Sequence, residues 1–229
     1  MTLRRRIETL YDEQVAEFLT CSEFQALESG TAPREAYDHF IANVVRAHLK
    51  ASQLVAFLYA VAPPAAAESR LGNLLEELHH PGLLRQFATG AGLGDQLPEL
   101  ETLAADDLRR VVAEPLLYGT LKELGLAAHG EIVAFEYMLA RIAGRIAAAL
   151  AHHGLSAKAL TWWTEHAEVD RRHAEQGLDD LEAYVRYYDL DPEDALAIVE
   201  MTLRQNVFVK RYLGELAAAR VRAGYGALR

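Results

Sequence analysis

Residues 160–188 show a long helical pattern with a carboxylate in its apolar seam. Alternating steps of three and four residues join Leu160, Trp163, Ala167, Asp170, Ala174, Gly177, Leu181, Tyr184 and Tyr188. His166, Asp170 and His173 have the spacing i, i+4 and i+7, so they share one face of a helix that advances about 100° per residue. Burying an isolated carboxylate costs free energy unless it is paired or binds a metal. These three residues are therefore predicted to bind a cation inside a helical protein.

The rest of the chain also has the character of helices. Ala, Leu, Glu and Arg recur at helical spacing, and alternating strand patterns with Asn-Gly or Asp-Gly turns are absent from the sequence. We expect an all-α fold. The predicted helices cover about residues 3–20, 32–61, 66–80, 107–125 (broken at Pro115), 127–153, 156–188 (N-capped by Ser156) and 191–224. Gly154 and Gly224 are expected to end the fifth and the last of them.

Seven helices without a linker indicate one domain. No internal repeat, low-complexity tract or Gly/Ser-rich linker divides the 229 residues, so we expect a single seven-helix bundle over residues 1–229. The formal net charge of −10, with dispersed basic residues, argues against a nucleic-acid surface.

The predicted localisation is the cytoplasm. Residues 1–14 begin with basic residues but lack an apolar run, so no signal peptide is expected. The most apolar stretch, residues 54–67, contains Pro63 and Pro64 and is shorter than the roughly 20 residues that a membrane span needs. The single cysteine, Cys21, excludes an internal disulfide and fits a reducing compartment.

Two other segments offer further ligands. In residues 127–153, a seam of the same spacing runs through Ile132, Glu136, Leu139, Ala143, Ile146 and Leu150, and Glu136 interrupts it with a charge. Glu131 is the alternative carboxylate, but its row ends at Arg145 and has the character of an amphipathic edge. We therefore favour Glu136.

The other segment, residues 72–80, contains two carboxylates and two histidines. Glu76 with His79 or His80, and Glu77 with His80, all have helical spacing. An E-x-x-H pair can hold one ion from a single helix face. Pro81 has no N–H to donate to the carbonyl of Glu77, so the helix should be interrupted beside these residues. The pattern alone does not choose between the pairs.

Together these units supply three carboxylates and three imidazoles. Such a mixture is typical of iron or manganese sites, and the number of ligands suits two ions better than one. A structural zinc ion ordinarily takes four ligands. The residues therefore favour two iron ions, with manganese as the alternative metal.

The order and spacing of these units resemble the haem-oxygenase-like dimetal oxidases and oxygenases over roughly residues 20–185. Glu77 and His80, followed by Leu83, Leu84 and Phe87, match the first ligand-bearing element of that family. Glu136 matches the second, and His166, Asp170 and His173 match the third. The Glu77-to-His80 interval is that of the alkene-forming fatty-acid decarboxylases, whereas other members have six intervening residues.

The resemblance implies an O2-dependent non-haem diiron oxidoreductase of the haem-oxygenase-like fold. Its ligands would be Glu77, His80, Glu136, His166, Asp170 and His173. The expected reaction is N-oxygenation, desaturation or oxidative C–C cleavage of a small substrate, such as an amino acid, a fatty acid or another carboxylate. An electron donor is implied, and a homodimer is one expected assembly. The alternatives are a ferritin-like iron-binding protein and a metal-independent member of the same fold.

Overall fold

The computed structural model describes residues 1–113, 120–206 and Tyr212, and the elements in this part are all helical. The elements are α1 (Leu3–Thr20), α2 (Ser22–Glu28), α3 (Arg34–His48), α4 (Ala51–Val61), α5 (Ala67–Glu77), α6 (His80–Gly90), the 3-10 turn η1 (Gly94–Gln96), α7 (Leu97–Ala113), α8 (Leu121–His152), α9 (Thr161–Tyr187) and α10 (Pro192–Asn206). The all-α prediction is confirmed.

The described residues form ten α-helices, so the prediction of seven is wrong. The expected helix 32–61 is split into α3 and α4, because Lys50 leaves the helical region at φ −114° and ψ 13°. No proline or glycine marks this break in the sequence. Residues 121–152 form the single helix α8, which joins two segments that we expected to be separate. Pro115 and Gly224 lie outside the described residues.

Local contacts explain where the two longest helices begin and end. The Thr120 side chain accepts from the N–H of Lys122, and Glu123 accepts from the N–H of Thr120, which caps the start of α8. Gly154 follows the end of α8 at φ +94°, as expected for a helix-ending glycine. Ser156 does not cap α9, since it accepts from Ala159 in a separate turn before the helix begins at Thr161.

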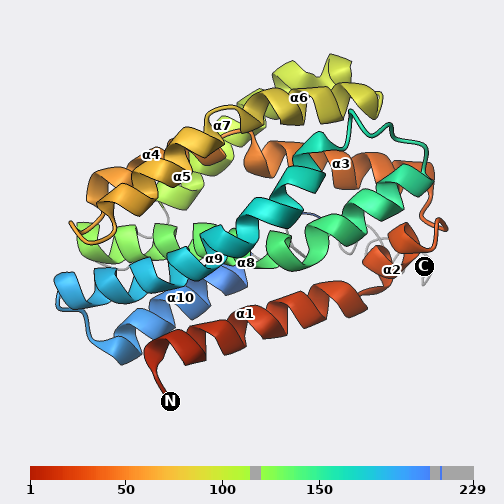
Figure 1. Ribbon diagram of the computed structural model, residues 1–229. Helices are drawn as coiled ribbons and strands as arrows, with labels where there is room; N and C mark the ends of the chain where they lie inside the picture. The colour runs from red at the N-terminus through yellow and green to blue at the C-terminus, as the bar shows by residue number, and fades with distance from the viewer. Residues whose placement is uncertain (114–119, 207–211, 213–229) are drawn as a thin grey trace, which may run out of the picture.

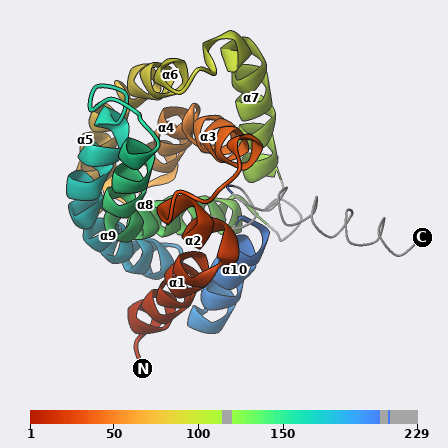
Figure 2. The same cartoon turned by 90° about the vertical axis from the view of Figure 1, so that its right-hand side faces the viewer.

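Helix α8 lies at the centre of the molecule (Figure 1), and it packs against α9 more extensively than any other helix pair of the described part. Helices α1 and α10 lie on one side of α8, and α3 to α7 lie on the other, as the two views show (Figure 2). All residues of α8 from Leu124 to Leu139 are buried. A helix that is buried all round belongs to the core. In the described residues no helix is long and apolar enough to cross a bilayer.

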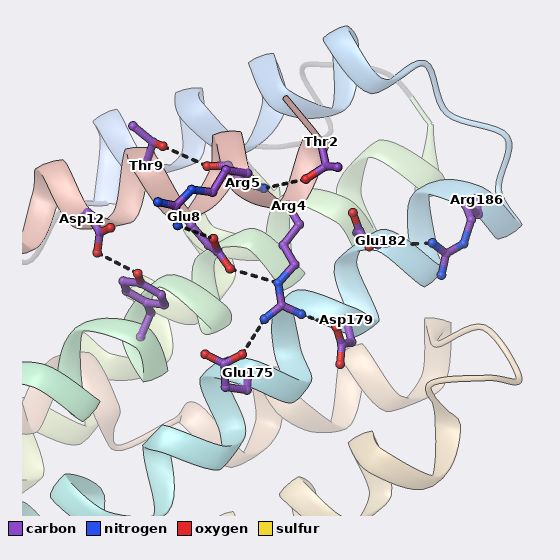
Figure 3. A network of polar contacts seen from close by, with 11 residues as sticks. Thr2, Arg4, Arg5, Glu8, Thr9, Asp12, Glu175, Asp179, Glu182 and Arg186 are labelled. Atoms are coloured by element: carbon purple, nitrogen blue, oxygen red, sulfur yellow. Dashed lines mark hydrogen bonds and ion pairs between the residues drawn. The ribbon is translucent and has the colours of Figure 1, made fainter.

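Charged side chains join α1 to the outer surface of α9 (Figure 3). Arg4 forms ion pairs with Glu175 and Asp179 of α9. Exposed pairs of this kind contribute about 0–1 kcal/mol each. The buried face of α1 makes a more specific contact, because the hydroxyl of Tyr11 donates to the carbonyl of Gly130 at 2.9 Å.

Close approach of α8 and α9 depends on a glycine. A Cβ atom at Gly177 would lie 2.6 Å from Cγ2 of Val133 and 3.3 Å from Nη2 of Arg70. A β-branched valine inside a helix has little rotamer freedom to move away. Gly177 therefore lets the two helices meet beside the segment that contains His166, Asp170 and His173.

Gly177→Ala should lower the free energy of unfolding by about 1–3 kcal/mol, because the added methyl group overpacks the contact between α8 and α9. Gly144→Ala is the matched control on the same helix pair, since its Cβ would meet only Ala167 at 3.9 Å. The control should be neutral or stabilising by up to about 1 kcal/mol. Urea denaturation measures both. Equal stability of the two variants would show that the contact is not tight.

Candidate metal centre

The predicted ligand face of α9 points into the interior. His166, Asp170 and His173 are 4%, 0% and 3% exposed. Nδ1 of His166 lies 2.8 Å from the carbonyl oxygen of Trp162, one turn earlier on α9. A ring that donates from Nδ1 has Nε2 free to accept a proton or bind a metal. The backbone of α9 thus fixes both the position and the tautomer of His166.

Glu77 and His80 lie on two successive helices. Helix α5 ends at Glu77, and α6 begins at His80 with Pro81 in its first turn. We expected the helix to continue to residue 80, but it ends three residues earlier. The interruption lies beside Pro81, as expected from the missing N–H of this residue. Both side chains are nevertheless buried, and Nδ1 of His80 lies 2.8 Å from Oε2 of Glu77.

These two residues meet His166. Ligand atoms of Glu77, His80 and His166 all lie within 4.8 Å of one another, and the rings of His80 and His166 are 4.3 Å apart between centroids. Three elements, α5, α6 and α9, thus contribute one buried donor each. The group is compact enough to hold one metal ion.

A second group forms around His173. Its Nδ1 lies 3.3 Å from Oδ1 of Asp170 and 3.9 Å from Oε1 of Glu136 on α8. Asn73 of α5 donates to the same oxygen of Glu136 at 2.6 Å. The structure thus buries all six predicted residues. Ligand atoms of Glu77, His80 and His166 converge within 4.8 Å, whereas Glu136 and Asp170 are linked through the ring of His173.

The alternative carboxylates of the sequence lie outside the group formed by Glu77, His80 and His166. Glu76 accepts from Arg172 at 2.8 Å and lies 3.0 Å from Nε2 of His173, with its side chain 38% exposed. Glu131 is buried but lines a separate hollow between α3, α4, α7 and α8. We expected its row to be an amphipathic edge, which is wrong for Phe135, Met138 and Ile142, because these three side chains are buried in the core.

Sequence reasoning missed two polar residues of α5. The fully buried side chains of this helix are Arg70, Asn73 and Glu77, spaced i, i+3 and i+7 on one face. Arg70 is 1% exposed, with Nε 2.8 Å from Oδ2 of Asp180 on α9. The opposite face exposes leucines at positions 71, 75 and 78. This reversed polarity is readable in the sequence, and it indicates a helix whose inner face is polar.

Burial and like charge act together on the carboxylates. Burial raises the pKa of Asp170 well above its ordinary value, and the carboxylates of Glu136 and Glu77 raise it further. Burial also raises the pKa of Glu136, against the attraction of Arg70 and His173. Carboxylates gathered in a low-dielectric interior favour protonation unless cations offset their charge.

The two imidazoles of α9 respond in opposite directions. Burial lowers the pKa of His166 well below its ordinary value, and the neighbouring His80 lowers it further. His173 is also buried, which opposes its charge, but Asp170 and Glu136 outweigh this effect and raise its pKa to about 9. His166 is thus held in the neutral form that binds metals, whereas His173 takes the place of a cation among the carboxylates.

The donors fit a metal centre. In the described part of the chain, Oδ2 of Asp170 and Oε2 of Glu136 are buried without a hydrogen-bond partner, and the nearest partner of Oδ1 of Asp170 is Nδ1 of His173 at 3.3 Å. Buried polar atoms are nearly always partnered, so such orphans call for an explanation such as an ion. Carboxylates and imidazoles together suit iron or manganese, and no described cysteine is near enough to join the group.

A comparison with protein families decides the affiliation of the chain. A family model described as an iron-containing redox enzyme matches residues 38–206, which is more than half of the chain. The chain belongs to this family. The resemblance to haem-oxygenase-like proteins is thereby confirmed, and the family indicates an oxidoreductase that contains iron. A comparison with curated proteins found no match to this chain.

Glu77→Gln and Glu76→Gln form a matched pair. Glu77→Gln should abolish binding of one metal ion per chain, because it replaces a buried anionic donor beside His80 and His166. Glu76→Gln should keep the metal content of the unsubstituted protein, since Glu76 forms an ion pair with Arg172 and lies outside the group of Glu77, His80 and His166. Metal content after anaerobic Fe(II) loading and gel filtration measures the difference. Loss of metal in Glu76→Gln with full content in Glu77→Gln would reverse the assignment.

Proposed function

We propose that the protein is an O2-dependent non-haem diiron oxidoreductase. Glu77, His80 and His166 would hold one ion, and Glu136, Asp170 and His173 would hold the other, with manganese as the alternative metal. The observation that supports this proposal best is the burial of two carboxylate oxygens, Oδ2 of Asp170 and Oε2 of Glu136, without a hydrogen-bond partner in the described residues. Iron bound there would supply the reduction of O2 that is coupled to oxidation of the substrate.

The surrounding residues prepare the donors for this task. The carbonyl of Trp162 keeps the proton of His166 on Nδ1, and Asn73 orients Glu136 through a bond of 2.6 Å. Partners of this kind orient metal ligands and raise metal affinity. Arg70 stabilises the charged form of Glu136 from the same face of α5. Residues of α5 and α9 thus maintain the position and the charge of the donors.

Asp170→Ala and His173→Ala should each abolish binding of at least one iron ion per chain and the optical change on exposure to O2. Each variant removes a buried donor that the chain cannot replace from its described neighbours. His152→Ala is the control, because His152 is exposed at the end of α8 and should keep two ions. Iron content and anaerobic optical titration are the measurements.

The iron content of the unsubstituted protein separates the competing functions. Two ions per chain support the diiron proposal. More than two ions per chain would favour a ferritin-like protein that stores iron, and none after anaerobic Fe(II) loading would favour a metal-independent member of the fold. Full two-iron occupancy in both the Asp170 and His173 variants would refute the ligand set.

We further propose that the substrate is a small carboxylate, such as an amino acid or a fatty acid. The hollow between α3, α4, α7 and α8 is lined by Lys50 as well as by the carboxylates Asp107 and Glu131. Three carboxylates around two divalent ions leave one positive charge, which favours an anionic ligand. His48 also lines the hollow, and its ring lies 4.9 Å from that of Trp162, which in turn lies 4.1 Å from His166. The rings of His48 and Trp162 therefore separate the hollow from His166, and Lys50 is a cation of its lining.

Lys50→Met should raise the KM for a carboxylate substrate about tenfold or more, because a charge-assisted hydrogen bond contributes about 1.5–3 kcal/mol. Amino acids and fatty acids are screened for accelerated O2 consumption by the iron-loaded protein, and KM is then measured for the best compound. Lys122→Met, on the exposed start of α8, is the control. An unchanged KM in Lys50→Met would show that the substrate carboxylate does not bind in this hollow.

A further inference from the structure

We propose that His79 and Glu165, together with His80, form a surface site that captures a divalent metal ion and passes it to the buried centre. The inference rests on the proposed function, since it assumes that Glu77, His80 and His166 bind a metal ion. Its ligand is a first-row divalent cation such as Fe(II). The site is distinct from the buried one, because two of its three residues are open to solvent.

The geometry of the outer group supports metal binding. Ligand atoms of His79, His80 and Glu165 all lie within 4.8 Å of one another. Nε2 of His79 lies 3.2 Å from Oε2 of Glu165, and these side chains are 57% and 40% exposed. Two imidazoles and one carboxylate are a donor set that first-row divalent metals accept. Their exposure leaves room for the water ligands of an ion that arrives from solution.

The three histidine rings form a row from the surface to the interior. The centroids of His79 and His80 are 4.5 Å apart, and those of His80 and His166 are 4.3 Å apart. Exposure falls along this row, since His79 is exposed whereas His80 and His166 are 3% and 4% exposed. His80 belongs to both groups of potential ligands. An ion that moves from the outer to the inner group can therefore keep one ligand throughout.

The chain builds both groups from the same two segments. His79 and His80 are consecutive at the start of α6, and Glu165 and His166 are consecutive on α9. In each pair the first residue faces the surface and the second is buried. Moving inward, an ion would exchange Glu165 for His166 and His79 for Glu77. Replacing ligands stepwise avoids a bare ion in a low-dielectric interior, which is costly.

A role in folding does not explain the outer pair. An exposed ion pair between His79 and Glu165 would contribute only about 0–1 kcal/mol to stability. Removing it should therefore leave the fold and the buried donors intact. This property makes the outer residues suitable for a kinetic test, in which the rate of metal uptake is separated from the amount of metal bound.

The test measures uptake of Co(II) by the metal-free full-length protein in a stopped-flow instrument, using the visible absorption of bound Co(II). His79→Ala, Glu165→Gln and the double variant should each slow uptake about tenfold or more, equivalent to about 1.4 kcal/mol in the barrier. The final amount of bound Co(II) should equal that of the unsubstituted protein. Glu168→Gln is the matched control, because it removes one exposed carboxylate from α9 in the next turn, and it should take up Co(II) at the original rate.

The outcomes separate this inference from the proposed function. If the unsubstituted protein binds no Co(II) or Fe(II), the proposed function fails. Unchanged uptake rates in the His79 and Glu165 variants, with full final binding, would overturn the surface site alone. A lower final amount in these variants would also overturn it, because the outer residues would then belong to the final centre. Equal slowing in Glu168→Gln would show that only general charge attraction is involved.

Discussion

The structure depends on the burial of three carboxylates in the interior of a helical bundle. Asp170, Glu136 and Glu77 lie on α9, α8 and α5, and all are almost fully shielded from water. Their mutual repulsion and loss of hydration oppose folding. Two cationic groups offset this cost. One is the buried guanidinium of Arg70, and the other is the ring of His173, whose pKa is raised by the neighbouring carboxylates. Oδ2 of Asp170 and Oε2 of Glu136 still lack partners among the described residues, and a bound metal ion would supply one. Such a site is consistent with membership of an iron-containing family.

Rigid and broken helices have different roles in the centre. Helices α8 and α9 are long, and their glycine-mediated contact at Gly177 fixes Glu136, Asp170 and His173 relative to one another. Glu77 and His80 instead flank the interruption between α5 and α6. The interruption turns the chain so that two residues only three positions apart can approach His166 from different helices.

Much of the centre could be predicted because helical periodicity reports burial. The seam through Asp170 and the seam through Glu136 identify inward faces by spacing alone, and the structure buries both residues. The spacing could not choose between Glu76 and Glu77, because both have partners on α9 and only the rotation of α5 separates them. Other features depend on tertiary packing. The break at Lys50 has no local marker, and the roles of Arg70 and Asn73 appear only when their partners on α9 and α8 are known.

The reversed polarity of α5 links metal binding to conformational stability. Its fully buried side chains are polar, and leucines at positions 71, 75 and 78 face solvent. The hydrophobic effect, which holds most amphipathic helices in place, acts on the docking of α5 mainly through the partly buried Leu74. Any ligand that binds only the folded state adds to its stability by mass action. An ion bound through Glu77 would thus stabilise the docking of α5. The free energy of opening this helix locally would then increase with the concentration of free metal ion.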